Sequence, residues 1–320
     1  MSERKALDPL SSDQLKESAR PAHETSGVFF IRSAGPPLDT AHEVKFRPLI
    51  QRIARSAAGA LAVLASASAL HGCGSREDLI IGVNDFMLER RDDFDGPELD
   101  PDYWSLATHT FEPNLAWFST ANAKIADGHL VLSITADPAP ASPMPNEVPK
   151  PYSAAEVRTR APFLYGRFRT RARLAGGDGV VSAFWGFYDR YAEEGAQLDN
   201  QIVFETGIPE GQTAHQFRYT VNVPIAPSGT DVQDAPSDPA SGFHVFGYDW
   251  TPTEVRFVFD GRTRLLINGD AAAELTQYQR LVLSAYPSSA GWLGDFDPQQ
   301  LPLAAEFDWV EVSSYQGSRP

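Results

Sequence analysis

The sequence predicts an all-β protein whose strands form a two-sheet antiparallel β-sandwich, the jelly-roll arrangement. Short segments in which apolar and polar residues alternate recur between residues 92 and 316, and no sustained helical periodicity interrupts them. The 25 prolines and 24 glycines supply turns between many short strands. Hydrophobic residues make up 42% of the chain and include 19 phenylalanines, enough to fill the space between two sheets.

The beginning of the chain predicts export. Residues 1–43 are polar and without periodicity, so we expect a disordered segment or one that precedes the true start. Residues 44–72 predict a signal peptide, because basic residues precede an apolar run too short to span a bilayer comfortably. Leu70 and Gly72 before Cys73 resemble a bacterial lipobox, which predicts lipid attachment at this only cysteine. The alternatives are that the signal peptide is cleaved without lipid attachment, or that the thiol of Cys73 has no role. The protein is expected to be a cell-envelope lipoprotein or secreted.

Charge and motifs exclude several classes of function. The formal net charge of -15 repels phosphates, so we expect no nucleic-acid partner and membrane contact only through a lipid anchor. The sequence has no His-x-x-x-His spacing for catalytic zinc and no Gly-x-Ser-x-Gly elbow of a serine hydrolase. We therefore expect no organic cofactor, and we expect a monomer. An acidic surface suits a neutral polysaccharide, although acidity more often serves solubility alone.

The folded domain, residues 92–316, is expected to follow a spacer at residues 73–91 that ends in an edge strand. An Asp-Gly turn at Asp127 and Gly128, followed by apolar residues at every second position, predicts a hairpin. Six prolines at residues 137–151 exclude a central strand there and predict a loop.

The middle of the domain carries strands with polar groups on one face. Residues 153–160 alternate so that Glu156 and Arg158 share a face, and the apolar run at 180–187 predicts a strand buried on both sides. On residues 199–205, Ile202 and Phe204 are predicted to enter the core. The opposite face of that strand displays Asp199, Gln201, Val203 and Glu205. Further strands are predicted at 216–222, 243–250, 255–259 and 281–286, with a polar loop at 224–241.

Several of these segments together resemble one family. In order and spacing they are similar to family 16 of the glycoside hydrolases, most nearly its bacterial lichenases, over about residues 92–316. The resemblance implies a jelly roll with a cleft for a β-glucan. The segments that carry it are residues 155–160, 165–168, 179–185, 199–205, 243–252, 291–294 and 305–310.

The active strand departs from the pattern of the family, in which it reads Glu-Ile-Asp-Ile-Glu. Here residues 201–205 read Gln-Ile-Val-Phe-Glu. The resemblance implies Glu205 as the general acid/base, with Gln201 at the nucleophile position and Val203 at the position of the supporting aspartate. With two carboxylates gone, the repulsion that would raise the pKa of Glu205 is expected to be lost as well.

The resemblance also implies residues that bind the glycan and an ion. Glu156 and Arg158 match residues that hydrogen-bond sugar hydroxyls, although a surface ion pair is the alternative. Three aromatic residues are candidates to stack on sugar rings or to belong to the core: Trp185, Tyr286 and Trp292. A structural calcium ion is implied at Asp308 and the backbone carbonyl of Gly128, unless Asp308 simply caps an edge.

Three hypotheses for function follow. A retaining glycosidase needs two carboxyl groups about 5 to 5.5 Å apart, and an amide at position 201 cannot attack the sugar. The first hypothesis is a glycan-binding protein on a hydrolase scaffold, with weak or no hydrolysis. The second is an active hydrolase that takes a carboxylate from elsewhere, with Asp199 or the loop 189–194 as donors. The third is a structural surface lipoprotein.

Overall fold

The computed structural model describes residues 85–137, 149–188, 200–223 and 229–317. The predicted extension, the signal peptide, Cys73, Asp199 and the loop 189–194 lie outside the described residues. In the ranges that are described, no helix combines the length and the apolar character needed to cross a bilayer.

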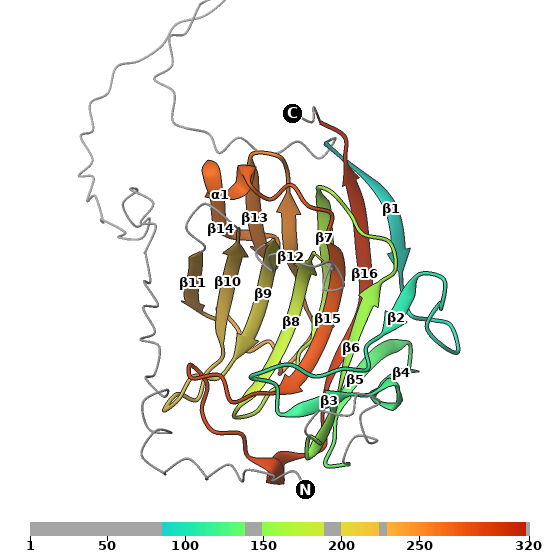
Figure 1. Ribbon diagram of the computed structural model, residues 1–320, viewed down its shortest axis with the longest axis vertical. Helices are drawn as coiled ribbons and strands as arrows, with labels where there is room; N and C mark the ends of the chain where they lie inside the picture. Colours follow the sequence, from blue (N-terminus) through green and yellow to red (C-terminus); the bar gives the residue numbers. More distant parts are fainter. Residues whose placement is uncertain (1–84, 138–148, 189–199, 224–228, 318–320) are drawn as a thin grey trace, which may run out of the picture.

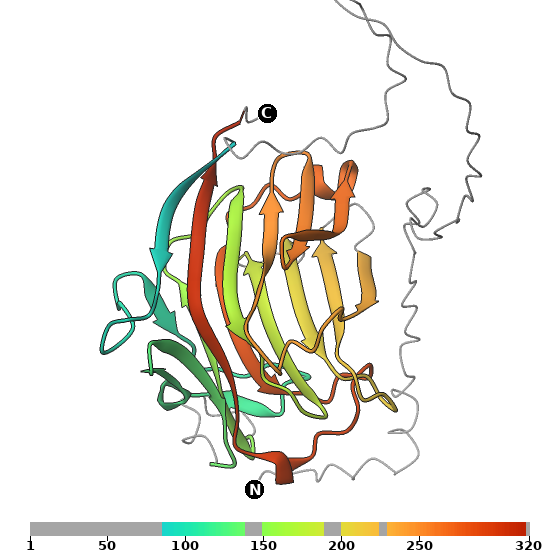
Figure 2. The ribbon, with the colours of Figure 1, turned by 180° about the vertical axis from the view of Figure 1, so that it is seen from behind.

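Two sheets pack face to face, and Figures 1 and 2 show the two layers from opposite sides. Within the described residues each sheet has eight strands, and all pairs are antiparallel except β3 with β6. Sheet A has the order β14-β13-β12-β7-β16-β5-β4, with β1 paired to β16. Its strands are β1 (Phe86–Asp92), β4 (Ala123–Ala126), β5 (His129–Ile134), β7 (Gly166–Arg173), β12 (His244–Trp250), β13 (Glu254–Phe259), β14 (Arg262–Asn268) and β16 (Leu303–Tyr315).

Sheet B has the order β11-β10-β9-β8-β15-β6-β2, with β3 paired to β6. Its strands are β2 (Trp104–Leu106), β3 (Ala116–Phe118), β6 (Tyr152–Thr159), β8 (Val180–Phe187), β9 (Gln201–Gly207), β10 (Gln216–Asn222), β11 (Gly229–Asp234) and β15 (Arg280–Pro287). The short helical turns in the connections are η2 (Thr120–Asn122), α1 (Asp270–Ala273) and η3 (Pro298–Gln300). The predicted two-sheet antiparallel jelly roll is confirmed.

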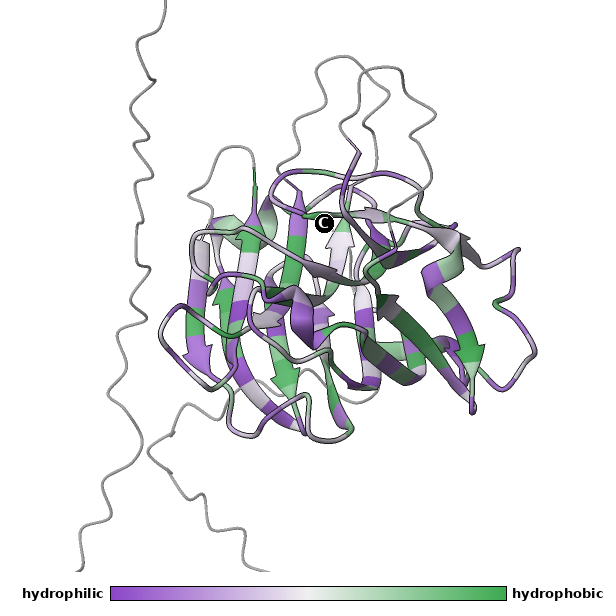
Figure 3. Ribbon diagram, turned by 90° about the horizontal axis from the view of Figure 1, so that it is seen from below, coloured by the Kyte–Doolittle hydropathy of each residue, from purple (hydrophilic) through white to green (hydrophobic). Residues whose placement is uncertain are grey.

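Aromatic side chains join the two sheets in the core. The ring of Phe204 on β9 lies 5.1 Å from that of Phe246 on β12, and Phe217 on β10 lies 4.7 Å from Phe259 on β13. Such tilted or edge-to-face pairs add about 0.5–1.5 kcal/mol each to the burial of their area. The strands carry alternating hydrophobic and hydrophilic bands, as Figure 3 shows. Polar residues of sheet B therefore point away from the core.

The predicted strands are present, and two further strands, β11 and β14, differ from expectation. The turn at Asp127 and Gly128 joins β4 to β5 with φ angles of 51° and 75°, both positive, as a two-residue hairpin turn requires. β1 begins at Phe86, so the edge strand expected at the end of the spacer is present. β11 lies inside the predicted loop 224–241, and β14 was not predicted. Both of these strands are at a sheet edge, where pairing on one side tolerates polar composition.

Candidate functional site

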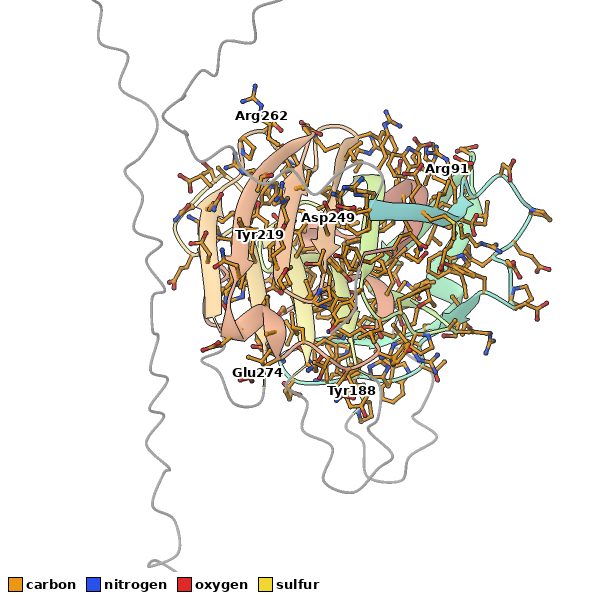
Figure 4. The ribbon with its side chains drawn as sticks, turned by 90° about the horizontal axis from the view of Figure 1, so that it is seen from above. Arg91, Tyr188, Tyr219, Asp249, Arg262 and Glu274 are labelled. Atoms are coloured by element: carbon orange, nitrogen blue, oxygen red, sulfur yellow. The ribbon has the colours of Figure 1, made fainter. Side chains whose placement is uncertain are left out.

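A pocket of about 760 Å³ lies on the outer face of sheet B. Figure 4 shows the two outer faces: Asp249 and Arg91 lie on the side of sheet A, and Tyr188, which follows β8, lies on the opposite side. The pocket is lined by neighbouring strands of sheet B and by the segment before β3. The lining residues are His109, Thr110, Phe111, Glu112, Glu156, Arg158, Ala183, Trp185, Phe187, Gln201, Val203, Glu205, Arg218, Thr220, Asn222, Thr230 and Tyr286.

Strand β9 supplies the centre of the pocket as its alternation predicts. Ile202 and Phe204 are 0% and 2% exposed and lie in the core, whereas Gln201, Val203 and Glu205 face the pocket. Positions 201 and 205 are four residues apart, so their Cα atoms are about 13 Å apart along an extended strand. Only long side chains that lean together could act on one bond from these two positions.

Glu205 is paired with an arginine on the next strand. Arg218 lies directly opposite Glu205 in the β9–β10 register, and its Nε donates to Glu205 Oε1 at 3.1 Å. The two side chains are 19% and 22% exposed. Burial raises the pKa of Glu205, and Arg218 opposes that rise. As expected, no repulsion from carboxylates at positions 201 and 203 contributes to this pKa, and burial supplies the upward shift by itself.

Gln201 and Val203 occupy the rest of this face. Asn222 on β10 donates from Nδ2 to Gln201 Oε1 at 3.1 Å, so the amide oxygen of Gln201 is held by a neighbouring amide. Val203 lies between Trp185 on β8 and Thr220 on β10 in the sheet register. An uncharged, hydrogen-bonded amide and an apolar side chain thus stand at these two positions.

Glu156 and Arg158 form the other polar group of the pocket. Arg158 donates from Nε to Glu156 Oε1 at 2.6 Å, and its Nη2 lies 3.1 Å from His109 Nε2. A guanidinium can only donate, so His109 accepts at Nε2 and carries its ring proton on Nδ1 in this contact. The predicted pair is therefore an ion pair inside the pocket, where Glu156 is 2% exposed, rather than one on an open surface.

The three predicted aromatic residues have different surroundings. Trp185 lines the pocket and donates from Nε1 to Ser284 Oγ at 3.3 Å. Tyr286 also lines it, and its pKa is raised by burial first and then by the charges of Glu205 and Glu156. Trp292 is not among the lining residues. Its ring centroid lies 4.5 Å from Cζ of Arg218, so it contacts a residue that lines the pocket.

The carboxylates that line the described pocket are far from one another. Glu156 and Glu205 lie in one row across sheet B, with β15 and β8 between their strands. Three strand spacings separate their Cα atoms by about 14 Å. Glu112 is bound at 2.6 Å by Lys150 and is 80% exposed. The site residues that sequence reasoning missed are His109 and Arg218. The alternation of β10 places Arg218 on the pocket face, but the strand register that sets it opposite Glu205 is not readable from the sequence.

The residues present do not fit the predicted calcium ion. Oδ2 of Asp308 accepts from Arg171 Nη1 at 2.5 Å, and His129 Nε2 lies 3.7 Å from Oδ1. Calcium takes six to eight oxygen ligands, and a guanidinium already holds this carboxylate. Among the described residues, no cluster of three or more His, Cys, Asp or Glu could hold a metal. Gly128 remains the turn residue between β4 and β5.

Comparison with known proteins gives one family. The profile of glycosyl hydrolases family 16 matches residues 111–311. A beta-glucanase of Fibrobacter succinogenes is 30% identical over 178 residues, which are 52% of this chain and 48% of the relative. A glucan endo-1,3-beta-glucosidase of Cryptopygus antarcticus is 30% identical over 186 residues, which are 55% of this chain and 67% of the relative. The chain thus spans about half the length of the first relative and two thirds of the second.

Solved structures share the fold. A β-1,3-1,4-glucanase (lichenase) from a mouse hindgut metagenome superposes with a TM-score of 0.58 at 25% identity, covering 71% of this chain and 99% of that one. The laminarinase catalytic domain of Thermotoga maritima superposes with a TM-score of 0.62 at 21% identity, covering 73% and 100%. The second likeness is one of fold alone.

Proposed function

The chain belongs to family 16 of the glycosyl hydrolases, and from this membership we propose that it binds a β-glucan and hydrolyses it weakly or not at all. The relatives named above are glucanases, which supports a glucan as the ligand. The pocket offers amide, hydroxyl and guanidinium groups to sugar hydroxyls. Trp185 and Tyr286 add aromatic surface for the flat C–H faces of the rings.

The observation that carries this proposal is the amide of Gln201, held by Asn222. The resemblance to the family assigns this position to the nucleophile. An amide is a poor nucleophile, and it has no charge to stabilise a developing positive charge on the sugar. Losing the nucleophile of a covalent mechanism costs several orders of magnitude in rate, roughly 10³-fold or more. Binding is spread over the whole pocket and survives the loss of one group.

Restoring the two carboxylates tests the proposal. We expect Gln201→Glu with Val203→Asp to raise hydrolysis of a mixed-linkage or β-1,3-glucan by at least about 10³-fold, with retention at the anomeric carbon. Adding Glu205→Gln to that variant should abolish the gain. Proton NMR of the anomeric products measures both. Gln299→Glu, an exposed change on η3 away from the pocket, is the matched control and should leave hydrolysis as in the wild type.

Two results would contradict the proposal. Turnover by the unmodified protein at about 1 to 1,000 per second, with Gln201→Ala no slower, would mean that the carboxylates act from elsewhere. Asp199→Asn and changes in the loop 189–194 would then locate them. Failure to bind any β-glucan in calorimetry would favour a structural surface lipoprotein.

We also propose that the protein is exported as a monomer and carries a lipid at Cys73. The basic segment, the short apolar run and the spacing from Leu70 to Cys73 support this proposal. Cells fed radiolabelled palmitate should label the wild type and not Cys73→Ser. Label that persists in the variant would show that Cys73 is not the attachment site.

A further inference from the structure

We propose that Arg218 is a positioning residue that holds the Glu205 carboxylate in the pocket against the effect of burial, and that Trp292 and Gly207 hold Arg218 in place. The inference deepens the proposed function and rests on it for the role of the pocket, because it names the residue that favours the form of Glu205 that accepts hydrogen bonds. It concerns residues of this chain alone, and the titration of Glu205 tests it without a glycan.

The first step is the contact between the two charges. Arg218 and Glu205 face each other across the β9–β10 pair, where opposite residues point to the same side of the sheet. Their 3.1 Å hydrogen bond joins a guanidinium to a carboxylate, and both side chains are about four-fifths buried. A charge-assisted bond that water screens poorly favours the ionised form of the carboxyl.

The second step is the support beneath Arg218. The guanidinium lies over the ring of Trp292, with 4.5 Å between Cζ and the ring centroid. Trp292 and Leu293 come close to β9 at Gly207, where a Cβ would lie 2.8 Å from Trp292 Cη2 and 2.5 Å from Leu293 Cδ2. Only glycine leaves the space for this approach. A contact path therefore runs from Gly207 through Trp292 and Arg218 to Glu205.

The third step is the electrostatic surroundings of Glu205. Arg218 faces it from β10, Tyr286 interacts with it from β15, and Glu156 lies further along the same row on β6. The neighbour on β8 is Ala183, which has no charge. Among the described residues, Arg218 is the one cation bonded to Glu205. Burial favours the protonated carboxyl and Arg218 favours the carboxylate.

The ion pair with Arg218 affects whether Glu205 can donate a proton or only accept a hydrogen bond. A general acid must carry a proton when the glycosidic oxygen leaves, whereas a carboxylate can only accept. Arg218 keeps Glu205 as a carboxylate, which accepts hydrogen bonds, over a wider range of pH. Because Arg218 holds Oε1 of Glu205, the orientation of the carboxylate is fixed and Oε2 is left for a ligand. Removing Arg218 leaves burial unopposed, so Glu205 should hold its proton to higher pH.

A carboxyl titration tests the inference. Protein labelled with ¹³C at the glutamate carboxyl carbons is titrated by NMR, and Glu205→Gln identifies the resonance of Glu205. We expect Arg218→Met to move the midpoint of Glu205 to higher pH, and Trp292→Ala and Gly207→Ala to move it in the same direction by less. Arg218→Lys, which keeps the charge without the planar fork, should fall between wild type and Arg218→Met. Arg262→Met, an exposed arginine on β14, is the control and should leave the midpoint unchanged.

The outcomes separate this inference from the proposed function. An unchanged midpoint in Arg218→Met overturns the inference, even where the protein binds glucan. A shifted midpoint in a protein that binds no glucan supports the inference and contradicts the proposed function. Should Arg218→Met fail to fold, the comparison of Arg218→Lys with wild type decides, since an unchanged midpoint there also overturns the inference. In the variant with both carboxylates restored, Arg218→Met should move the basic limb of the pH–rate profile to higher pH.

Discussion

The two buried acidic side chains of the pocket are each held by an arginine. Glu205 is paired with Arg218, and Glu156, whose side chain is 1% exposed, is paired with Arg158. Taking a charge out of water is costly, so removing one partner of such a pair destabilises more than the pair itself stabilises. The residues that shape the pocket are therefore also residues on which folding depends.

Arg158→Met should show this directly. It removes the guanidinium from a buried carboxylate, so we expect the free energy of unfolding to fall by about 3 kcal/mol, measured by urea denaturation. Glu156→Gln with Arg158→Met removes the buried charge as well and should recover part of that loss. A double variant no more stable than Arg158→Met would contradict the argument.

For single residues, the sequence predicts the face of the sheet on which a side chain lies better than it predicts which residue lies opposite. Alternation correctly placed Gln201, Val203 and Glu205 on the pocket face of β9. It did not predict that Arg218 lies opposite Glu205, because a shift of register by two residues would leave the same faces with other partners.

Among the elements, the connection from β11 to β12 is held to the sheets by a few polar contacts. Ala235 N donates to the carbonyl of His215 at 3.0 Å, and Nδ1 of His215 lies 3.0 Å from Oδ1 of Asp238. Leu174 N donates to the carbonyl of Pro239 at 2.9 Å. His215 is 6% exposed, so this connection depends on a buried imidazole.

The stability of this connection should depend on pH. Burial lowers the pKa of His215, and Asp238 opposes that effect. A base with a depressed folded pKa binds its proton more readily when unfolded, so its contribution is complete above the unfolded pKa of about 6.5 and is lost as pH falls below it. Urea midpoints at pH 8 and pH 5.5 should differ less in His215→Asn than in wild type. Asp238→Asn, which removes the opposing charge, should widen the difference, and an equal pH dependence in all three proteins would refute the role of His215.

Strand prediction from the sequence succeeded where the two faces of a strand differ, and it failed at the edge strands β11 and β14. β6, β9 and β10 show clear alternation and were predicted. β11 was taken as a loop because its residues are polar on both faces, and its pairing with β10 alone defines it as a strand.

For the molecule as a whole, paired charges on the outer face of sheet A take the place where calcium was predicted. Arg171 binds Asp308 and Arg173 binds Glu306, both at 2.5 Å. Cζ of each arginine also lies over the ring of Phe243, at 4.7 and 5.6 Å from its centroid. This network of ion pairs joins β7 to β16.

Chelation should therefore leave the melting temperature of the wild type unchanged. Arg171→Met frees the carboxylate of Asp308, and millimolar calcium should then raise the melting temperature of that variant, because a ligand bound only by the folded state stabilises it. Differential scanning calorimetry with EDTA or calcium measures both. A wild type that melts earlier in EDTA would restore the calcium site predicted from the sequence.

The overall architecture could be predicted because alternation, turn residues and aromatic content all indicate two packed antiparallel sheets. The order of strands within each sheet could not, since it depends on pairings between segments far apart in the chain. That order sets Glu156 and Glu205 three strands apart, and so decides how the pocket is laid out.

The position of Trp185 gives the protein an optical signal of its own. Its indole lines the pocket beside Val203, while Trp104 and Trp250 are 2% and 1% exposed in the core. A sugar ring that displaces water from the pocket changes the polarity around the Trp185 indole and leaves these two core indoles as they are. The part of the tryptophan emission change that is lost in Trp185→Phe can thus follow occupancy of the pocket in unlabelled protein, including in variants that no longer turn anything over.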